Sequence, residues 1–241
     1  SYIQDIVAGE TAAFLRQRGV AREAPVELVD RVLFNPNLDT VGFNAVMEVI
    51  KNITILTLIL VGAAVIRERE RGTIEHLLVM PIGPSEIAAA KIWANGAAVV
   101  LATAVSLQVM TLVLPAGVIG GSIPLFLAGV VVYVFAVGAL GILLATVASS
   151  MPQFGLLAIP IFVIMILLSG GVTPFENMPP LLRNTMHVVP STHFVKFAQA
   201  VMFRGAGIDL VWRDLAVMAA LGVVFLAAAM ARFRTMLSRQ V

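Results

Sequence analysis

The residues best suited to chemistry in this sequence are the charged ones between positions 65 and 91. Eight charges fall within these 27 residues, and the first five form the run RERER, which begins at Arg67. On a helix, opposite charges three or four residues apart form surface pairs that contribute about 0.2–0.5 kcal/mol each. The run can therefore be a solvated helix end with pairs such as Arg67–Glu70 and Glu68–Arg71, or it can be a docking surface for a partner.

A second group of polar residues lies within stretches that are otherwise apolar. Glu48 and Lys51 are three residues apart, which favours either an ion pair at a membrane surface or a polar lining of an outer gate. Hydroxyl and amide side chains inside a bilayer either bond to a neighbouring helix or line a substrate pathway. Both interpretations stay open for Thr54, Thr57, Thr103, Ser106 and Gln108.

No arrangement typical of an enzyme is found in the sequence. It contains no GxxxxGK[ST] segment that could cradle the phosphates of ATP, and we find no nucleophile paired with a base. There is no cysteine, so thiolate metal sites are excluded. His187 and His193 are six residues apart, which suits neither helical nor strand spacing for a metal. We therefore expect no catalytic residue, no metal site and no cofactor bound by this chain.

The elements that must position these residues are membrane helices. Hydrophobic residues make up 59% of the 241 residues and charged residues 12%, against about 25% charged residues in a typical soluble domain. A net charge of +2 does not favour a nucleic-acid partner. A bilayer-crossing helix needs roughly 20 apolar residues. Five stretches reach or approach that length, which predicts an all-α polytopic membrane protein: 43–66, 92–114, 125–148, 154–172 and 212–231.

The fourth stretch and the segment that follows it are irregular. Pro160 should kink the helix of 154–172, and the sequence Ser-Gly-Gly at its outer end should terminate it. A proline pair should begin another helix, and residues 191–203 continue as an amphipathic one. We assign the breaking residues to an outer lid segment of 174–211 and its boundary: Ser169, Gly170, Gly171, Pro174, Pro179 and Pro180.

Small residues recur at every fourth position on two of the stretches. Such ridges permit helices to pack closely, although chance is a strong competitor in an alanine-rich chain. One ridge lies on the third stretch and comprises Gly141, Ala145 and Ser149. The other lies on the second stretch and comprises Ala94, Ala98, Ala102 and Ser106.

Basic residues in the short loops set the expected orientation, because they are retained on the cytoplasmic side. If the C-terminus lies inside, the cytoplasmic side holds seven of them: Arg67, Arg69, Arg71, Lys91, Arg232, Arg234 and Arg239. The outer loops then hold three: Arg183, Lys196 and Arg204. This bias predicts that residues 67–91 and the C-terminus are cytoplasmic and that residues 1–42 are extracytoplasmic.

The first 42 residues have the pattern of a folded segment. A helical face of Ile3, Ile6, Val7 and Phe14 precedes Gly19, and the stretch PVELVDRVLFNP predicts a strand that ends in an Asn-Pro turn. We interpret 1–42 as the end of an α/β extracytoplasmic domain whose beginning precedes Ser1, and 43–241 as the transmembrane domain.

Within the charged loop the sequence predicts a short amphipathic helix. Gly72 should end the preceding helix, Thr73 can cap the next one, and Pro81 should end it. Glu75 would lie near the positive N-terminal end of this helix. An apolar face beside a charged collar favours docking over exposure to water. The residues of that face are Ile74, Leu77 and Leu78.

These motifs resemble the permease subunits of ABC-2 type exporters. The segment RERERGTIEHLLVMPIGPSEIAAAKI is similar to that family's cytoplasmic loop, which has a glutamate-rich span end, Gly-Thr, Glu, paired leucines, Pro and a Lys opening the next helix. The segment LLSGGVTPFENMPPLLRNTMHVVPSTHFVKFAQAVMFRG, residues 167–205, resembles the region between the last two spans, and the FNPN turn at 34–37 fits as well. The resemblance covers most of the chain and is greatest to the bacterial inner-membrane, multidrug-type branch.

The resemblance implies six spans per subunit, paired permease subunits and an ATPase subunit under each. It implies that Thr73–Met80 is the coupling helix and that the outer segment dips back into the membrane. Five spans fit a chain that lacks its first span and most of its outer domain. The residues expected to couple to the ATPase are Arg67, Glu68, Glu70, Gly72, Thr73, Ile74, Glu75, Leu77, Leu78, Pro81 and Lys91.

The expected function is that of an inner-membrane permease subunit which couples ATP hydrolysis by a partner ATPase to export of an amphipathic cargo. ATP and Mg²⁺ would be bound by that partner. Further expected partners are a second permease subunit, identical or not, and membrane lipid, and a periplasmic adaptor protein stays open. One rival is a mechanotransmission or scaffold subunit that drives an outer partner without moving cargo itself. An ion channel or ion-coupled carrier is disfavoured, because three of the spans contain no charged residue.

Overall fold

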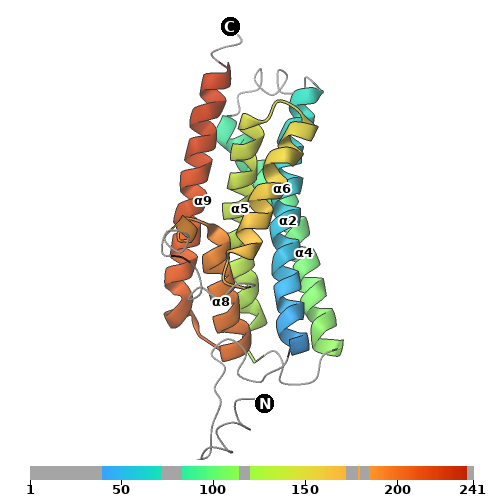
Figure 1. Cartoon of the computed structure of the whole chain (residues 1–241), viewed down its shortest axis with the longest axis vertical. Helices are drawn as coiled ribbons and strands as arrows, with labels where there is room; N and C mark the ends of the chain where they lie inside the picture. Colours follow the sequence, from blue (N-terminus) through green and yellow to red (C-terminus); the bar gives the residue numbers. More distant parts are fainter. Residues whose placement is uncertain (1–39, 72–82, 114–119, 172–178, 180–184, 238–241) are drawn as a thin grey trace, which may run out of the picture. The chain divides into compact units, whose positions relative to one another are not determined.

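The computed structural model describes residues 40–71, 83–113, 120–171, 179 and 185–237, which belong to one compact unit, Asp39–Val241. Within these ranges the chain forms only α-helices and no strand (Figure 1), as the sequence predicts. The helices are α2 (Thr40–Glu70), α4 (Pro84–Val113), α5 (Ile123–Val147), α6 (Met151–Leu167), α8 (Pro190–Arg204) and α9 (Ile208–Leu237). The strand and helix predicted within 1–42 lie outside the described residues, and so does the coupling helix.

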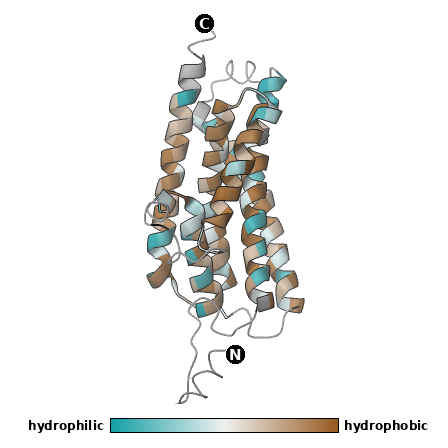
Figure 2. Cartoon of the chain, in the orientation of Figure 1, coloured by the Kyte–Doolittle hydropathy of each residue, from teal (hydrophilic) through white to brown (hydrophobic). Residues whose placement is uncertain are grey.

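Four of the described helices are long and apolar enough to cross a membrane: α2, α4, α5 and α9. The fourth predicted span, 154–172, corresponds to α6, which is shorter and has 17 residues. At 1.5 Å per residue it is about 25 Å long, a little less than the ~30 Å of a bilayer's hydrocarbon core. Apolar residues cover most of the bundle in Figure 2, and hydrophilic ones gather at the end of α2 that carries the charged run.

Two helices continue beyond their apolar stretches into the charged loop. α2 runs through the RERER sequence to Glu70, and α4 already begins at Pro84, so that Lys91 lies inside it. The Glu86 carboxylate accepts a hydrogen bond of 3.0 Å from the Gly83 amide and thereby caps α4. The interhelical connection is therefore shorter than the predicted 67–91. Backbone hydrogen bonds do not depend on side-chain polarity, so a helix can extend past the apolar residues that mark a span.

The end of α6 is close to its predicted position. α6 contains Pro160 and finishes at Leu167. It is followed by bends at Ser169, Gly170 and Gly171, where Gly170 has a φ of 90°. Glycine adopts that left-handed conformation without the steric cost that a Cβ would bring, which explains why this sequence ends the helix.

α8 confirms the helix predicted over 191–203, but it lies within the bundle. It packs against α5 and α9 in the half of the bundle away from the charged end of α2 (Figure 1). Most of its residues are buried, including Phe194 and Phe197 in the middle of the helix. Phe194 stacks on Tyr133 of α5 with ring centroids 4.0 Å apart. An interfacial lid with one face in solvent would not be buried in this way.

α5 is the centre of the bundle and contacts all five of the other described helices. Two residues of its predicted small-residue ridge lie in the core: a Cβ on Gly141 would stand 2.9 Å from the Leu58 carbonyl oxygen of α2, and Ala145 is fully buried. The third, Ser149, lies after the end of α5 and is exposed, so the ridge is shorter than predicted. The second ridge behaves differently, because Ala94, Ala98, Ala102 and Ser106 are all exposed on α4. Only the α5 ridge therefore packs a helix within the described residues.

Candidate coupling site at the charged end of α2

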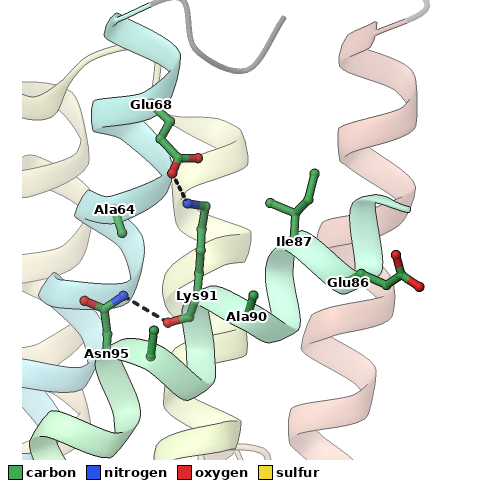
Figure 3. A pocket seen from close by; sticks show the side chains of 8 residues that line it. Ala64, Glu68, Glu86, Ile87, Ala90, Lys91 and Asn95 are labelled. Atoms are coloured by element: carbon green, nitrogen blue, oxygen red, sulfur yellow. Dashed lines mark hydrogen bonds and ion pairs between the residues drawn. The ribbon is translucent and has the colours of Figure 1, made fainter. Parts of the chain in front are cut away.

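The charged end of α2 is joined to α4 by an ion pair. The Lys91 ammonium group donates to the Glu68 carboxylate across the two helices (Figure 3). The Lys91 side chain is 14% exposed and that of Glu68 is 32% exposed. The pair is therefore partly shielded from water, so salt screens it less than a fully exposed pair.

The same end of α2 also bonds to the short turn between α5 and α6. A Glu70 carboxylate oxygen accepts a 2.8 Å hydrogen bond from the Met151 amide, and the Arg69 guanidinium donates to the Ala148 carbonyl oxygen. Within the turn, the Gln153 side-chain oxygen accepts hydrogen bonds of 2.7 Å and 2.6 Å from the Ser149 amide and hydroxyl. The turn thus presents an ordered backbone to the α2 charges.

We call the contacts of Glu68, Arg69 and Glu70 with Lys91, Ala148 and Met151 the charged clasp. Both acidic residues of the RERER run bond to other helices or their turns, so the run is more than the solvated helix end that the sequence leaves open. Arg67 and Arg71 are exposed, and the Arg67 Nε donates to the Ala63 carbonyl oxygen one turn back along α2. A displacement of the α2 end must therefore act on α4 and on the α5–α6 turn together.

A groove of about 470 Å³ lies beside the clasp, where α2 ends and α4 begins (Figure 3). The Glu68–Lys91 pair, the Glu86 carboxylate and the Asn95 amide supply its polar atoms, and the Asn95 Nδ2 donates to the Lys91 carbonyl oxygen at 2.9 Å. Small and apolar side chains form the rest of the wall: Ala64, Ile87, Ala90 and Ala94. Such a groove has room for the side chains of a docked partner segment.

Seven of the residues predicted to couple to the ATPase lie outside the described part of the chain: Gly72, Thr73, Ile74, Glu75, Leu77, Leu78 and Pro81. Of the rest, the structure brings Glu68 and Lys91 into direct contact and directs Glu70 to the α5–α6 turn. The role of that turn has no signal in the sequence, because Ala148 and Met151 take part through their backbone atoms.

The residues predicted to line a substrate pathway do not gather in one place. Glu48 and Lys51 form an ion pair on α2, far along the helix from the clasp. The Thr54 hydroxyl is buried and bonds to the Tyr133 hydroxyl on α5 at 2.8 Å. Thr57 is also fully buried, and its hydroxyl has no hydrogen-bond partner among the described residues.

The three predicted pathway residues of α4 face different ways. The Thr103 hydroxyl is buried and bonds to the Val99 carbonyl oxygen at 2.8 Å. Ser106 and Gln108 are exposed on the outer surface of α4. Tyr133 is a polar contact that our sequence analysis misses. The available signal is a tyrosine in the middle of an uncharged span, since a buried phenol usually finds a hydrogen-bond partner.

The outer segment joins α6 and α8. Ser169 is buried and its hydroxyl bonds to the Ile166 carbonyl oxygen at 2.9 Å, while the Ser191 hydroxyl of α8 donates to the Met165 carbonyl oxygen of α6 at 2.8 Å. Pro179 is exposed, and Pro174 and Pro180 lie outside the described residues. The described residues contain no group of three or more His, Cys, Asp or Glu that could hold a metal.

Comparison with known families decides what kind of membrane protein carries this clasp. Residues 1–231 match the family described as ABC-2 family transporter protein. The chain belongs to the ABC-2 transporter family. With its long apolar helices, this ABC-2 family member is a multi-pass membrane protein.

Relatives with similar sequences are described as permeases. The chain is 47% identical over 237 residues to the inner membrane transport permease YhhJ of Escherichia coli strain K12, covering 97% of this chain and 62% of that protein. It is 33% identical over 224 residues to the probable multidrug ABC transporter permease YbhR of the same strain, covering 89% and 58%. Identity to the probable multidrug ABC transporter permease YbhS is 26% over 212 residues, covering 85% and 55%. The chain thus spans about 62% of the length of YhhJ.

Proposed function

We propose that this ABC-2 family chain is part of the permease subunit of an ATP-driven exporter in the inner membrane. ATP and Mg²⁺ are bound and ATP is hydrolysed on a separate ATPase subunit, which docks at the end of the bundle that carries the charged clasp. The observation that supports this proposal is the clasp itself. It joins α2, α4 and the α5–α6 turn at one end of the bundle through Glu68, Lys91 and Glu70.

The proposed cycle is alternating access. ATP binding closes the ATPase subunits, and the amphipathic segment 73–80 receives the push on its apolar face. The clasp transmits that push to α2, α4 and the α5–α6 turn as one unit, because its contacts oppose relative movement of these elements. Reorientation of packed helices around a central pathway is a known route for such coupling.

The cargo and partners follow from chemistry and from the relatives. We propose an amphipathic cargo, drug-like or lipid-like, because YbhR, 33% identical to this chain, is described as a probable multidrug permease. The permease works with a second permease subunit, identical or not, and with the surrounding lipid. A periplasmic adaptor is a further candidate partner. The cytoplasmic placement of the clasp rests on the bias of basic residues.

A charge reversal at the clasp tests this proposal. In Glu68→Lys, two ammonium groups face each other beside the groove, and we expect ATP-dependent export by membranes to fall roughly fivefold or more, the usual range for a broken coupling between sites. The double variant Glu68→Lys/Lys91→Glu restores the pair and should recover most of the activity. The control variant is Arg232→Glu, which reverses one exposed charge on α9 outside the clasp and should leave export unchanged.

Three measurements keep the outcomes apart: protein level, co-purification of the ATPase, and export. Normal level and co-purification with low export in Glu68→Lys support coupling through the clasp. Unchanged export in that variant removes the clasp from the mechanism. Leu77→Asp tests docking itself, since a charge desolvated on the ATPase should weaken binding and reduce co-purification. If no ATPase co-purifies even with the unaltered full-length protein, the exporter proposal is wrong.

A second candidate function is a mechanotransmission subunit that works an outer partner without moving cargo through its own spans. The arrangement of the polar residues favours keeping this candidate, because Thr54 is buried inside the bundle whereas Gln108 is exposed on α4. Proteoliposomes that contain only the full-length permease and its ATPase distinguish the two. ATP-dependent movement of a drug-like probe supports the permease, and ATP hydrolysis without probe movement supports mechanotransmission.

A further inference from the structure

A histidine near the beginning of α8 bridges two acceptor oxygens. The His193 Nδ1 lies 3.0 Å from an Asp214 carboxylate oxygen on α9, and its Nε2 lies 3.0 Å from the backbone carbonyl oxygen of His187. The His193 side chain is 10% exposed and that of Asp214 is 27% exposed. This contact joins α8, the helix of the outer segment, to α9.

The geometry fixes the number of protons that the ring needs. A carboxylate and a backbone carbonyl both accept hydrogen bonds and donate none. A neutral imidazole has only one N–H, so it can satisfy one of these two oxygens and must turn a lone pair towards the other. Both contacts are favourable together only when His193 carries two protons and a positive charge, which also makes the bond to Asp214 charge-assisted.

Among the residues that the structure describes, few other ionisable groups lie around this contact. On the α8 side they are the His187 ring, whose centroid is 6.3 Å from that of His193, and Lys196 one turn further along. α9 contributes Asp209 and Arg213 beside Asp214, and the Arg213 guanidinium lies 5.7 Å from the Trp212 ring centroid.

The remaining helices that pack against α8 add little charge near this contact. α5 and α6 contain no Asp, Glu, Lys, Arg or His, and Tyr133 is the one ionisable residue in these two helices. On α2, Glu48 and Lys51 neutralise each other, and the RERER run is at the other end of the bundle. The Asp214 carboxylate is the acidic partner that His193 contacts.

The first turn of α8 depends on few polar contacts. Ser191 bonds to α6 and His193 bonds to α9, whereas the middle of the helix is held by stacked aromatic rings such as Phe194 on Tyr133. The loss of one charge-assisted bond therefore affects mainly the end of α8 that follows the outer segment.

We propose that His193 and Asp214 form a proton-dependent latch that fastens the first turn of α8 to α9. The latch is complete when the ring carries two protons, and it loses one hydrogen bond when the ring releases a proton, because one ring nitrogen then turns a lone pair towards an acceptor oxygen. On the orientation expected from the basic residues, this contact faces the outer half of the membrane, where pH varies with the medium. Its effect on the release of cargo rests on the proposed export function, but the latch itself does not.

Two experiments on the full-length protein in lipid nanodiscs test the latch without using transport. First, ¹⁵N-labelled histidine NMR reports the protons on each ring nitrogen. The sequence holds three histidines, His76, His187 and His193, so His76→Gln and His187→Gln assign the signals and leave the His187 carbonyl in place. We expect His193 to show protons on both ring nitrogens while the first turn of α8 is closed, and on one ring nitrogen only where it opens.

Second, cysteine labelling reports whether α8 opens. Thr192 is fully buried in the first turn of α8 and Val188 is 58% exposed, so Thr192→Cys and Val188→Cys give a buried and an exposed thiol in a chain without native cysteine. We divide the labelling rate of the buried cysteine by that of the exposed cysteine. This ratio cancels the pH dependence of thiol reactivity itself. From about pH 6 to about pH 8.5 we expect this ratio to rise roughly tenfold, the scale of one charge-assisted hydrogen bond.

The variant His193→Gln decides between a latch and a merely structural residue. Glutamine does not titrate in this range, so the labelling ratio should lose its pH dependence, whereas His187→Gln should keep it. A closed α8 in which the His193 ring carries only one proton, or a ratio whose pH dependence survives in His193→Gln, overturns the latch. Either result leaves the export proposal untouched, because that proposal is judged by ATPase co-purification and export.

Discussion

Replacement of Gly141 by alanine should destabilise the bundle although alanine is the better helix former. A Cβ at this position would stand 2.9 Å from the Leu58 carbonyl oxygen and 3.4 Å from the Gly62 amide nitrogen. Both contacts are with the backbone of α2, which cannot turn away as a flexible side chain can. The two helices must therefore move apart, and every contact along the α2–α5 interface is weakened.

The magnitude follows from two opposing terms. Glycine to alanine within a helix contributes about 0.5–1 kcal/mol of stability, and overpacking of a well-packed core costs about 1–3 kcal/mol. The net expectation is a loss of up to about 2.5 kcal/mol, with a middle value of about 1 kcal/mol, which lowers the melting temperature by a few degrees for a chain of this size. Gly155 on α6 is the matched control, because nothing lies within 4 Å of its added Cβ. Gly155→Ala should therefore show only the gain in helix stability, without the cost of overpacking.

The assay is thermal unfolding of the purified full-length protein in one detergent, with the wild-type protein and both alanine variants measured side by side. We expect the order Gly155→Ala, wild type, Gly141→Ala, from most to least stable. If Gly141→Ala melts at or above the temperature of the Gly155→Ala variant, α2 and α5 do not approach each other as described. The reasoning about the α5 ridge would then fail.

Three further predictions concern the core, the orientation and the pathway. Tyr133→Phe removes the hydrogen bond to Thr54 and should lower the stability by about 0.6 kcal/mol, the average for a hydrogen bond between membrane helices. The same thermal assay measures this change, and an unchanged stability would show that the bond is not formed. In intact cells a membrane-impermeant maleimide should label Val188→Cys, whereas Ser85→Cys should react only after the membrane is opened, and the opposite pattern would place the charged clasp on the outside. Gln108→Leu should change the relative export of several cargos with ATPase co-purification unaltered, and an unchanged cargo profile would remove Gln108 from the pathway.

The positions of the helices could be predicted from the sequence because a bilayer demands long apolar runs with satisfied backbone groups. The end of α6 was also predictable, since glycine acts through local backbone geometry. How far each helix extends beyond its apolar run was harder to predict, because a charged residue such as Glu70 can continue a helix as well as end it. Ser191 illustrates the same limit: it begins a predicted outer helix, yet it is fully buried against α6.

The sequence by itself determined that this chain crosses a membrane several times and that one end of its first described span is highly charged. Only the tertiary structure decided which side chains meet. Glu68 and Lys91 are 23 residues apart, Thr54 and Tyr133 are 79 apart, and His193 and Asp214 are 21 apart. Periodicity shows which residues share one face of a helix, but the rotation and height of one helix against another depend on the packing of the whole bundle. Close approaches such as that of Gly141 to Leu58 fix the relative rotation and height of two helices. The polar contacts between the helices follow from this arrangement.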